Sequence, residues 1–410
     1  MLSPEVDSPA VLRELSDAEG HLTTICFKTG PPELTGVELE WTVHDASDPS
    51  RPVDPDRLRR ALGPYAPTTL DPAGAHLALA HQGTITVEPG GQVEISTVPH
   101  HSLAALFAAT GDDTDRLRDL LRTAGLVLGT SGIDPYRPPR PCVDTPRYRA
   151  MRHAFDRRGA AGRTMMFSTA GLQLCLDAGR PDEVVGRWVA LHAFGPPLLA
   201  TFATARRHAG RDTGWASARM VAWQDIDPAR TRPVWSSATR ATDPVAAWSA
   251  YALSAPLLCV RRSGDDWTVP PGLTFADWMA GALPEPPTVD DLEYHLSTLF
   301  PPVRPRGYLE VRYLDAQPAD EWIAPVGVLA ALLADPTALD AARAACEPVA
   351  DRWAEAARCG LADPPLARAA TAVLDLAVRA LDRTDLGPTT RTEIGRIVER
   401  RLAAGKGEHR

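Results

Sequence analysis

The chain has 410 residues, of which 44% are hydrophobic and 23% charged, a composition typical of a globular protein with a sizeable core. The formal net charge of −9 argues against nucleic acid or an anionic membrane as the main partner, because both usually require clustered Lys and Arg. No apolar stretch is long enough to cross a bilayer, and the start "MLSPEVDSPA" lacks a signal-peptide pattern, so we expect a cytoplasmic protein. The six cysteines show neither a CxxC pair nor zinc-ligand spacing, which predicts separate reduced thiols.

Apolar periodicity along the chain predicts both helices and strands. The proline-rich segment between 131 and 147 is expected to be a loop. We see no internal repeat and no long flexible linker, so we expect one catalytic domain over 1–410, with a core at about 20–325 and a helical portion at about 325–405. Helices are predicted over 9–20, 54–62, 102–128, 147–158, 182–209 and 243–261, and through the Ala-rich part beyond 321, with breaks near Pro336, "GLADPP" and "DLGP".

Four predicted strands share one design, an apolar face opposite a polar face. Side chains two positions apart on a strand point to the same side of the sheet. In "GVELEW" the shared polar positions are Glu38 and Glu40, and in "TVEPGGQVEIS" Glu88 precedes a Pro-Gly-Gly turn and Glu94 follows it. In "GLQLCLDAG" and "GYLEVRYLD" the polar positions include Gln173, Cys175, Glu310 and Arg312.

Ordinary strands with solvated polar faces would explain any one of these patterns, but such faces usually mix Thr, Ser and Lys with the acids. Here carboxylates predominate, and like charges on neighbouring strands repel each other. If the polar faces line one cavity, Mg²⁺ bound to oxygen ligands and to substrate phosphates would remove the repulsion. The chain contains neither GxxxxGK[ST] nor a strand-linked GxGxxG, so a nucleotide such as ATP would be bound through the metal.

Glycoside hydrolysis by two of the carboxylates is a competing interpretation. It requires only one pair of acids and leaves the others unexplained. It also favours aromatic sugar platforms, whereas the ten tryptophans are scattered along the chain. A Ser or Cys nucleophile with a partner His has no recognisable local signature in this sequence.

Five stretches occur in order between about residues 33 and 325: "GVELEW", "TVEPGGQVEIS", "GLQLCLDAG", "ARMVAWQDIDPART" and "LEYHLSTLFPPVRPRGYLEVR". Together they resemble the glutamate-cysteine ligases of the plant and actinobacterial type, most closely the actinobacterial ligases of ergothioneine biosynthesis. The resemblance implies an α+β fold similar to glutamine synthetase, a curved antiparallel sheet with helices on its convex side and a helical C-terminal portion. It also implies that ATP and L-glutamate form a γ-glutamyl phosphate, which the amine of L-cysteine attacks to give γ-glutamylcysteine.

The resemblance assigns roles to the polar positions of these strands. Arg312 and Glu310 become the catalytic candidates, because a guanidinium fork matches the shape of a phosphoryl group or a carboxylate. Arg219, Arg230 and Arg312 become candidates for binding substrate carboxylates, and Gln173 and Cys175 for contacting the nucleotide. The implied Mg²⁺ ligands are Glu38, Glu40, Glu88, Glu94, Gln173 and Glu310.

Two departures from the family pattern leave alternatives open. Cys175 stands where relatives usually carry Asn, which replaces an amide by a weakly hydrogen-bonding thiol, and Arg232 stands where a Gly is usual. A ligase of the same superfamily that uses another amine or acid is the nearest alternative. A nucleotide-binding relative without catalysis is the second.

Overall fold

A six-stranded antiparallel sheet lies at the centre of the computed structural model, which describes residues 10–30, 33–237, 239 and 243–407. The expected antiparallel α+β architecture is therefore confirmed. In spatial order the strands are β3 (Thr84–Val87), β4 (Val93–Ser96), β1 (Thr35–Trp41), β6 (Gly171–Leu176), β10 (Leu309–Asp315) and β9 (Val303–Pro305). Two small ribbons lie outside this sheet: β2 (Val43–Asp45) with β5 (Leu126–Leu128), and β7 (Arg207–His208) with β8 (Arg211–Asp212).

The apolar face of the sheet packs against the long helix α6 (Val184–Phe202). Leu39, Leu174 and Val311 project from three neighbouring strands into one continuous hydrophobic cluster that also contains most of α6. On the same side, the hydroxyl of Tyr313 donates a hydrogen bond to the carbonyl of Leu191 in α6, at 3.3 Å. The burial of this face leaves the opposite, polar face of the sheet for binding.

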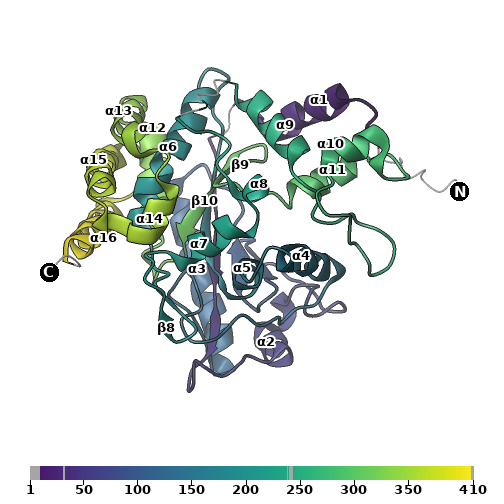
Figure 1. Ribbon diagram of the computed structural model, residues 1–410. Helices are drawn as coiled ribbons and strands as arrows, with labels where there is room; N and C mark the ends of the chain where they lie inside the picture. Colours follow the sequence, from purple (N-terminus) through teal and green to yellow (C-terminus); the bar gives the residue numbers. More distant parts are fainter. Residues whose placement is uncertain (1–9, 31–32, 238, 240–242, 408–410) are drawn as a thin grey trace, which may run out of the picture.

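The C-terminal helices form a layer behind α6, drawn in green to yellow in Figure 1. Gly195 permits the close approach of this layer, because a Cβ at that position would collide with the indole of Trp353. The predicted breaks are confirmed, since helices begin at Pro336, Pro364 and Pro388. The layer consists of α12 (Ile323–Ala334), α13 (Pro336–Cys346), α14 (Trp353–Cys359), α15 (Pro364–Ala380) and α16 (Pro388–Gly407).

The remaining helices surround the sheet. Figure 1 shows α1, α9, α10 and α11 gathered on the side away from the C-terminal layer, and α4 and α5 close to the lower part of the sheet. Their bounds are α1 (Leu15–Cys26), α2 (Pro55–Leu62), α3 (Leu103–Thr123), α4 (Pro146–Asp156), α5 (Ala161–Ser168), α7 (Ala218–Ile226), α8 (Pro228–Thr231), α9 (Pro244–Ser254), α10 (Phe275–Asp277) and α11 (Val289–Leu296).

Some helices differ from the sequence expectations. The helix predicted over 9–20 begins at Leu15, where Glu14 and Asp17 form a capping box, and ends at Cys26; residue 9 lies outside the described residues. Helix α6 ends at Phe202, not at residue 209, because the backbone N–H of Thr204 donates to the carboxylate of Asp315 at 2.9 Å and draws the chain out of the helix. Helices α5, α7, α8, α10 and α11 were not predicted.

Two further expectations concern membranes and disulfides. Within the described residues no single helix is long and apolar enough to span a bilayer. The segments Ile323–Ala334 and Pro336–Val349 reach that length and apolar composition only when taken together, and the chain bends by 114° between them. All six cysteines are free thiols, as the spacing predicts.

Candidate active site

The polar positions of five strands form one row across the sheet. Glu40 lies directly opposite Glu94, and Glu38 lies opposite Gln173. Glu310 lies between Cys175 on one neighbouring strand and Arg304 on the other. Antiparallel pairing therefore brings carboxylates that are far apart in the sequence onto one face of the sheet. Glu38 and Glu310, for example, are separated by 272 positions.

A β-bulge lies beside Gln173, at Arg312 and Tyr313. The register between β10 and β6 shifts by one residue between Val311 and Leu314, so Arg312 and Tyr313 together oppose Gln173. The side chain of Arg312 turns to the polar face, where it donates hydrogen bonds to the Gln173 amide oxygen and, at 2.8 Å, to Glu310. Arg312 therefore keeps the face that it shares with Glu310 by strand alternation.

A cavity of about 290 Å³ lies over this polar row. The sheet contributes its acidic floor, helices α4, α5 and α7 contribute apolar walls, and the segment from 297 to 306 contributes a basic rim. Helices therefore cover both faces of the sheet. Those on the apolar face were expected, whereas those on the polar face were not. The lining includes Glu38, Glu40, Glu88, Gln92, Glu94, Arg147, Tyr148, Met151, Met165, Met166, Gln173, Trp223, Ser297, Phe300, Arg304, Arg306 and Arg312.

Three arginines surround Glu310, whose side chain is fully buried. Arg304 donates to both of its carboxylate oxygens, at 2.6 and 3.1 Å, and Arg312 donates at 2.8 Å. Arg306 lies 3.7 Å from one of the same oxygens. Burial alone would raise the pKa of Glu310, but Arg304 and Arg312 outweigh it and hold the pKa at about 2. Glu310 is therefore an anion held in one orientation.

The other carboxylates of the row lack this compensation. Burial, reinforced by Glu310, raises the pKa of Glu38. Burial, reinforced by Glu40, raises the pKa of Glu88 to about 7. Burial, reinforced by Glu38, raises the pKa of Glu94 well above its ordinary value. The repulsion expected from the sequence is thus present in the folded chain.

The carboxylates of Glu38 and Glu88 fit the requirements of a divalent cation. Glu40 accepts from the N–H of Gly171 at 2.6 Å and from Gln173 at 3.0 Å, whereas no hydrogen bond or ion pair reaches the carboxylates of Glu38 and Glu88 within the described part of the chain. Carboxylates that converge without protein donors offer the oxygen ligands that Mg²⁺ prefers. In one group of three, the ligand atoms of Glu38, Cys175 and Glu310 lie within 4.8 Å of one another.

Arg219 and Arg230 are buried but lie outside the cavity lining. Arg219, which is 2% exposed, forms an ion pair with Asp315 at 3.6 Å and donates to the carbonyl of Arg312 at 3.0 Å, so it supports the wall from behind. Arg230, which is 1% exposed, donates to Asp227 at 3.0 Å and to the carbonyl of Pro256 at 2.6 Å. Direct contact of either arginine with substrate stays a prediction.

Sequence reasoning missed the basic rim. Arg304 pairs with Glu310 across the β9–β10 hairpin, so counting the alternation back through "VRPRGYLE" would have placed it on the polar face. Arg147 lies in the first turn of helix α4 and donates to the hydroxyl and the carbonyl of Ser297, both at 3.1 Å. Its contact spans 150 residues of sequence and has no local signal.

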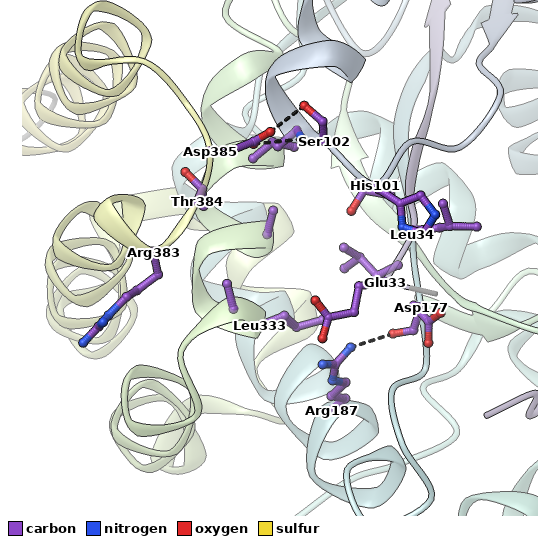
Figure 2. Close-up of a pocket in the computed structure, with 15 residues that line it drawn as sticks. Glu33, Leu34, His101, Ser102, Asp177, Arg187, Leu333, Arg383, Thr384 and Asp385 are labelled. Atoms are coloured by element: carbon purple, nitrogen blue, oxygen red, sulfur yellow. Dashed lines mark hydrogen bonds between the residues drawn. The ribbon is translucent and has the colours of Figure 1, made fainter. Parts of the chain in front are cut away.

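A second cavity, of about 360 Å³, lies between the start of β1, the start of α3 and the end of α12 (Figure 2). Two of its charged groups, Arg187 and Asp385, already have protein partners. Arg187 donates to the carbonyl of Asp177 at 3.1 Å, and Asp385 accepts from the backbone N–H groups of Leu103 and Ala104 at 3.0 and 3.2 Å. None of the predicted site residues lines it, so the cavity over the polar row is the candidate active site.

A buried sheet face that presents carboxylates and arginines to a cavity is typical of enzymes that transfer phosphoryl groups with the help of divalent cations. The sequence model of glutamate-cysteine ligase family 2 matches residues 34–397. The chain belongs to this family.

Individual relatives agree with the assignment. Glutamate-cysteine ligase EgtA of Mycobacterium tuberculosis is 38% identical over 387 residues, which covers 93% of this chain and 87% of that protein. EgtA of Mycolicibacterium smegmatis is 39% identical over 90% of this chain and 85% of its own length. The chloroplastic glutamate-cysteine ligase of Medicago truncatula is 32% identical over 57% and 47%. A solved glutamate-cysteine ligase of Francisella tularensis aligns with 93% of this chain and 95% of its own at 13% identity, and its TM-score of 0.40 adds nothing to the assignment.

Proposed function

We propose that this chain joins L-glutamate to L-cysteine with hydrolysis of ATP to ADP and phosphate, giving γ-L-glutamyl-L-cysteine. The observation that carries the proposal is the family match, which extends over 34–397 and contains every carboxylate and arginine that lines the cavity. As a member of the family, the chain is an ATP-dependent ligase. The acceptor amine, the metal and the roles of single residues belong to the proposal.

The reaction needs the γ-phosphoryl group of ATP to move to the side-chain carboxylate of glutamate, where two anions must approach each other. The residues that the resemblance gives as Mg²⁺ ligands are Glu38, Glu40, Glu88, Glu94, Gln173 and Glu310. Glu38 and Glu88 would hold the ion most readily, because Gln173 and Glu310 already accept hydrogen bonds from Arg312. When bound, Mg²⁺ neutralises charge on the phosphates and helps to orient them.

The protein's own residues supply positioning and further positive charge. Arg312 is fixed by Glu310 and Gln173, so its guanidinium would meet the transferred phosphoryl group without reorganising. Arg147 and Arg306 bring additional positive charge to the rim. Met151, Met165 and Trp223 exclude water from the opposite wall, which would protect the acyl phosphate from hydrolysis. The amine of cysteine then attacks the acyl carbon and phosphate leaves.

We also propose that the chain works as one catalytic domain, because a single apolar cluster extends from Leu12 to Val398. The product would feed ergothioneine or a related thiol, as the sequence resemblance implies. Loss of that thiol in a strain that lacks the gene would test this part of the proposal.

The decisive experiment measures ADP release by the purified chain with ATP, Mg²⁺, glutamate and a panel of amines, with mass spectrometry of the product. Release that requires both glutamate and cysteine, with a product of the mass of γ-glutamylcysteine, supports the proposal. Turnover only with a different acid or amine would make the chain a ligase of another specificity. Tight binding of Mg-ATP without turnover on any acceptor would identify a non-catalytic relative.

A further inference from the structure

One buried acceptor in the lining of the candidate active site has no partner. The side chain of Gln92 is 3% exposed, and its Nε2 donates to the carbonyls of Thr169 and Met166, at 2.8 and 3.3 Å. Because a carbonyl accepts only from a donor, these two bonds fix which end of the amide is the nitrogen. The other end, Oε1, is buried and has no hydrogen-bond partner within the described residues.

The other glutamines that are buried in the described part of the chain have a donor for their Oε1. Gln173 accepts from Arg312. Gln317 is also 3% exposed; its Nε2 likewise donates to two backbone carbonyls, both at 2.8 Å, and its Oε1 accepts from Arg401 at 2.9 Å. Buried polar atoms are nearly always satisfied in native proteins, so the Oε1 of Gln92 points to a donor that a ligand supplies.

The surroundings of Gln92 favour a donor with positive charge. Across the Pro-Gly-Gly turn the backbone N–H of Glu88 donates to the carbonyl of Gln92 at 2.8 Å, so these two residues face each other. Glu94 lies two positions further along the chain, on the same polar face. All three residues line the cavity. The two carboxylates attract a cationic N–H donor, whereas a neutral donor gains only the hydrogen bond.

The same cavity also contains a buried donor without a partner. Arg312 is 8% exposed, and its Nε donates to none of the described residues. A ligand that satisfies both side chains must accept a hydrogen bond from the arginine and donate one to the glutamine. An amino acid carries both groups, because its carboxylate accepts and its ammonium group donates.

We propose that the Oε1 of Gln92 accepts a hydrogen bond from the ammonium group of an amino-acid substrate, and that Gln92 thereby selects substrates that carry this group. The inference rests on the proposed function for the two amino acids that could supply the ammonium group, L-glutamate and L-cysteine. The selection follows from the cost of desolvation, because an analogue without the ammonium group leaves the buried oxygen unpaired in the complex.

Substrate analogues that lack the ammonium group test the proposal. Glutarate is L-glutamate without this group, and 3-mercaptopropionate is L-cysteine without it. Isothermal titration calorimetry of the full-length chain, with Mg²⁺ and a non-hydrolysable ATP analogue, measures the affinity for each of the four compounds. The affinity for the ATP analogue itself is measured separately. The affinity ratio within each pair reports the contribution of the ammonium group and cancels effects that are common to both members.

Three variants are compared with the parent chain. Gln92→Met removes the donor and the acceptor at similar volume, whereas Gln92→Glu keeps an acceptor oxygen whether or not its carboxyl group is ionised. Gln317→Met is the matched control, because it also removes two hydrogen bonds to backbone carbonyls but lies outside the lining of this cavity. Thermal melts establish that each variant is folded. Gln92→Asn, which withdraws the amide by one methylene, replaces Gln92→Met if that variant does not fold.

In Gln92→Met we expect the affinity ratio of one pair to fall by about tenfold or more, as for the loss of a hydrogen bond to a charged group, while the affinity for the ATP analogue changes by less than about twofold. The pair that responds identifies the amino acid whose ammonium group is bound. Gln92→Glu and Gln317→Met should keep both ratios. Unchanged ratios in Gln92→Met would overturn the proposal, and so would an equal fall in Gln317→Met or a loss of affinity for the ATP analogue alone.

Turnover separates this inference from the proposed function. Cysteine-dependent ADP release by the parent chain, together with unchanged ratios in Gln92→Met, overturns only the role of Gln92. A ratio that falls in Gln92→Met, in a chain that binds the amino acid but never releases ADP with glutamate and cysteine, overturns the proposed function and leaves the contact with the ammonium group in place.

Discussion

The guanidinium of Arg304 grips both carboxylate oxygens of Glu310, with Nε–Oε2 at 2.6 Å and Nη2–Oε1 at 3.1 Å. The two residues face each other across the hairpin of β9 and β10, and both are almost fully buried. A bidentate pair of this kind fixes orientation as well as charge. The pair fixes the Glu310 carboxylate in a position where Arg312 also donates to it, so it positions the arginines that line the cavity.

Removing Arg304 should expose the cost of an uncompensated buried charge. We expect Arg304→Met to lower the free energy of unfolding by about 3 kcal/mol, because among the described residues Glu310 would keep only Arg312 as a hydrogen-bond donor, with Arg306 at 3.7 Å. Urea denaturation measures this change. Adding Glu310→Gln to Arg304→Met should recover part of the loss, and a double variant that costs the full sum of the two single variants would contradict the coupling.

Glu38→Gln should separate stability from activity. Because no described residue donates a hydrogen bond to the Glu38 carboxylate and its pKa is raised by burial and by Glu310, we expect the neutral variant without metal to melt about 2 °C higher than the parent chain. ADP release should fall at least about tenfold, as for loss of a metal-site group. Glu355→Gln, at an exposed position of α14, is the control and should change neither quantity. Full activity of Glu38→Gln at ordinary Mg²⁺ would reject the role of Glu38.

The raised pKa of Glu88 should make the metal-free chain less stable as the pH rises. The folded chain binds this proton up to a pKa of about 7, whereas the unfolded chain releases it near 4.5. The folded state therefore binds more protons between these values, and the contribution of Glu88 to stability falls as the pH rises from 4.5 to 7. The buried His192 and His295, with pKa values lowered to about 4 by burial, act in the opposite direction below their ordinary value of 6.5.

The comparison of the parent chain with Glu88→Gln cancels the histidines. We expect the melting temperature of the variant minus that of the parent to increase from pH 4.5 to pH 7 in the absence of metal. The measurement is a series of thermal melts in chelated buffers. A difference that is constant across this range would show that Glu88 has no raised pKa in the folded chain. With saturating Mg²⁺ the same difference should reverse, if Glu88 binds the ion.

Gly90 should tolerate no side chain, because its backbone packs directly on that of Phe167 in α5. The same turn is held by two hydrogen bonds to the carbonyl of Pro89, from the N–H groups of Cys142 and Val143 at 2.7 and 3.0 Å. We expect Gly90→Ala to displace the turn that carries Glu88, to lower the free energy of unfolding by about 2 kcal/mol and to reduce ADP release.

The control for this substitution is Gly186→Ala in α6, where a Cβ would meet nothing within 4 Å. That change should stabilise the chain by up to about 1 kcal/mol, because Ala is the better helix former. Denaturant unfolding of both variants measures the two changes in the free energy of unfolding. Equal effects of the two substitutions would show that the close approach of Gly90 to α5 does not matter.

Much of the fold's local design follows from the sequence. The breaks at Pro336, Pro364 and Pro388 were predicted because proline cannot continue a helix and is favoured in its first turn. The start of α1 was missed by several residues, because the capping box of Glu14 and Asp17 outweighed the apolar pattern before it. Helices such as α5, which forms one wall of the cavity, were missed because packing and not periodicity defines them.

The sequence alone determined which side chains share a face of the sheet, because a strand alternates with a period of two wherever its partners lie. Glu38 with Glu40 and Glu310 with Arg312 were grouped for this reason. Only the tertiary structure decided that these strands are neighbours, that Arg304 and Arg147 reach the same cavity, and that Arg230 does not. Those facts depend on strand order and on contacts between residues far apart in the chain, which arise from packing the whole molecule and leave no mark in any short stretch of sequence.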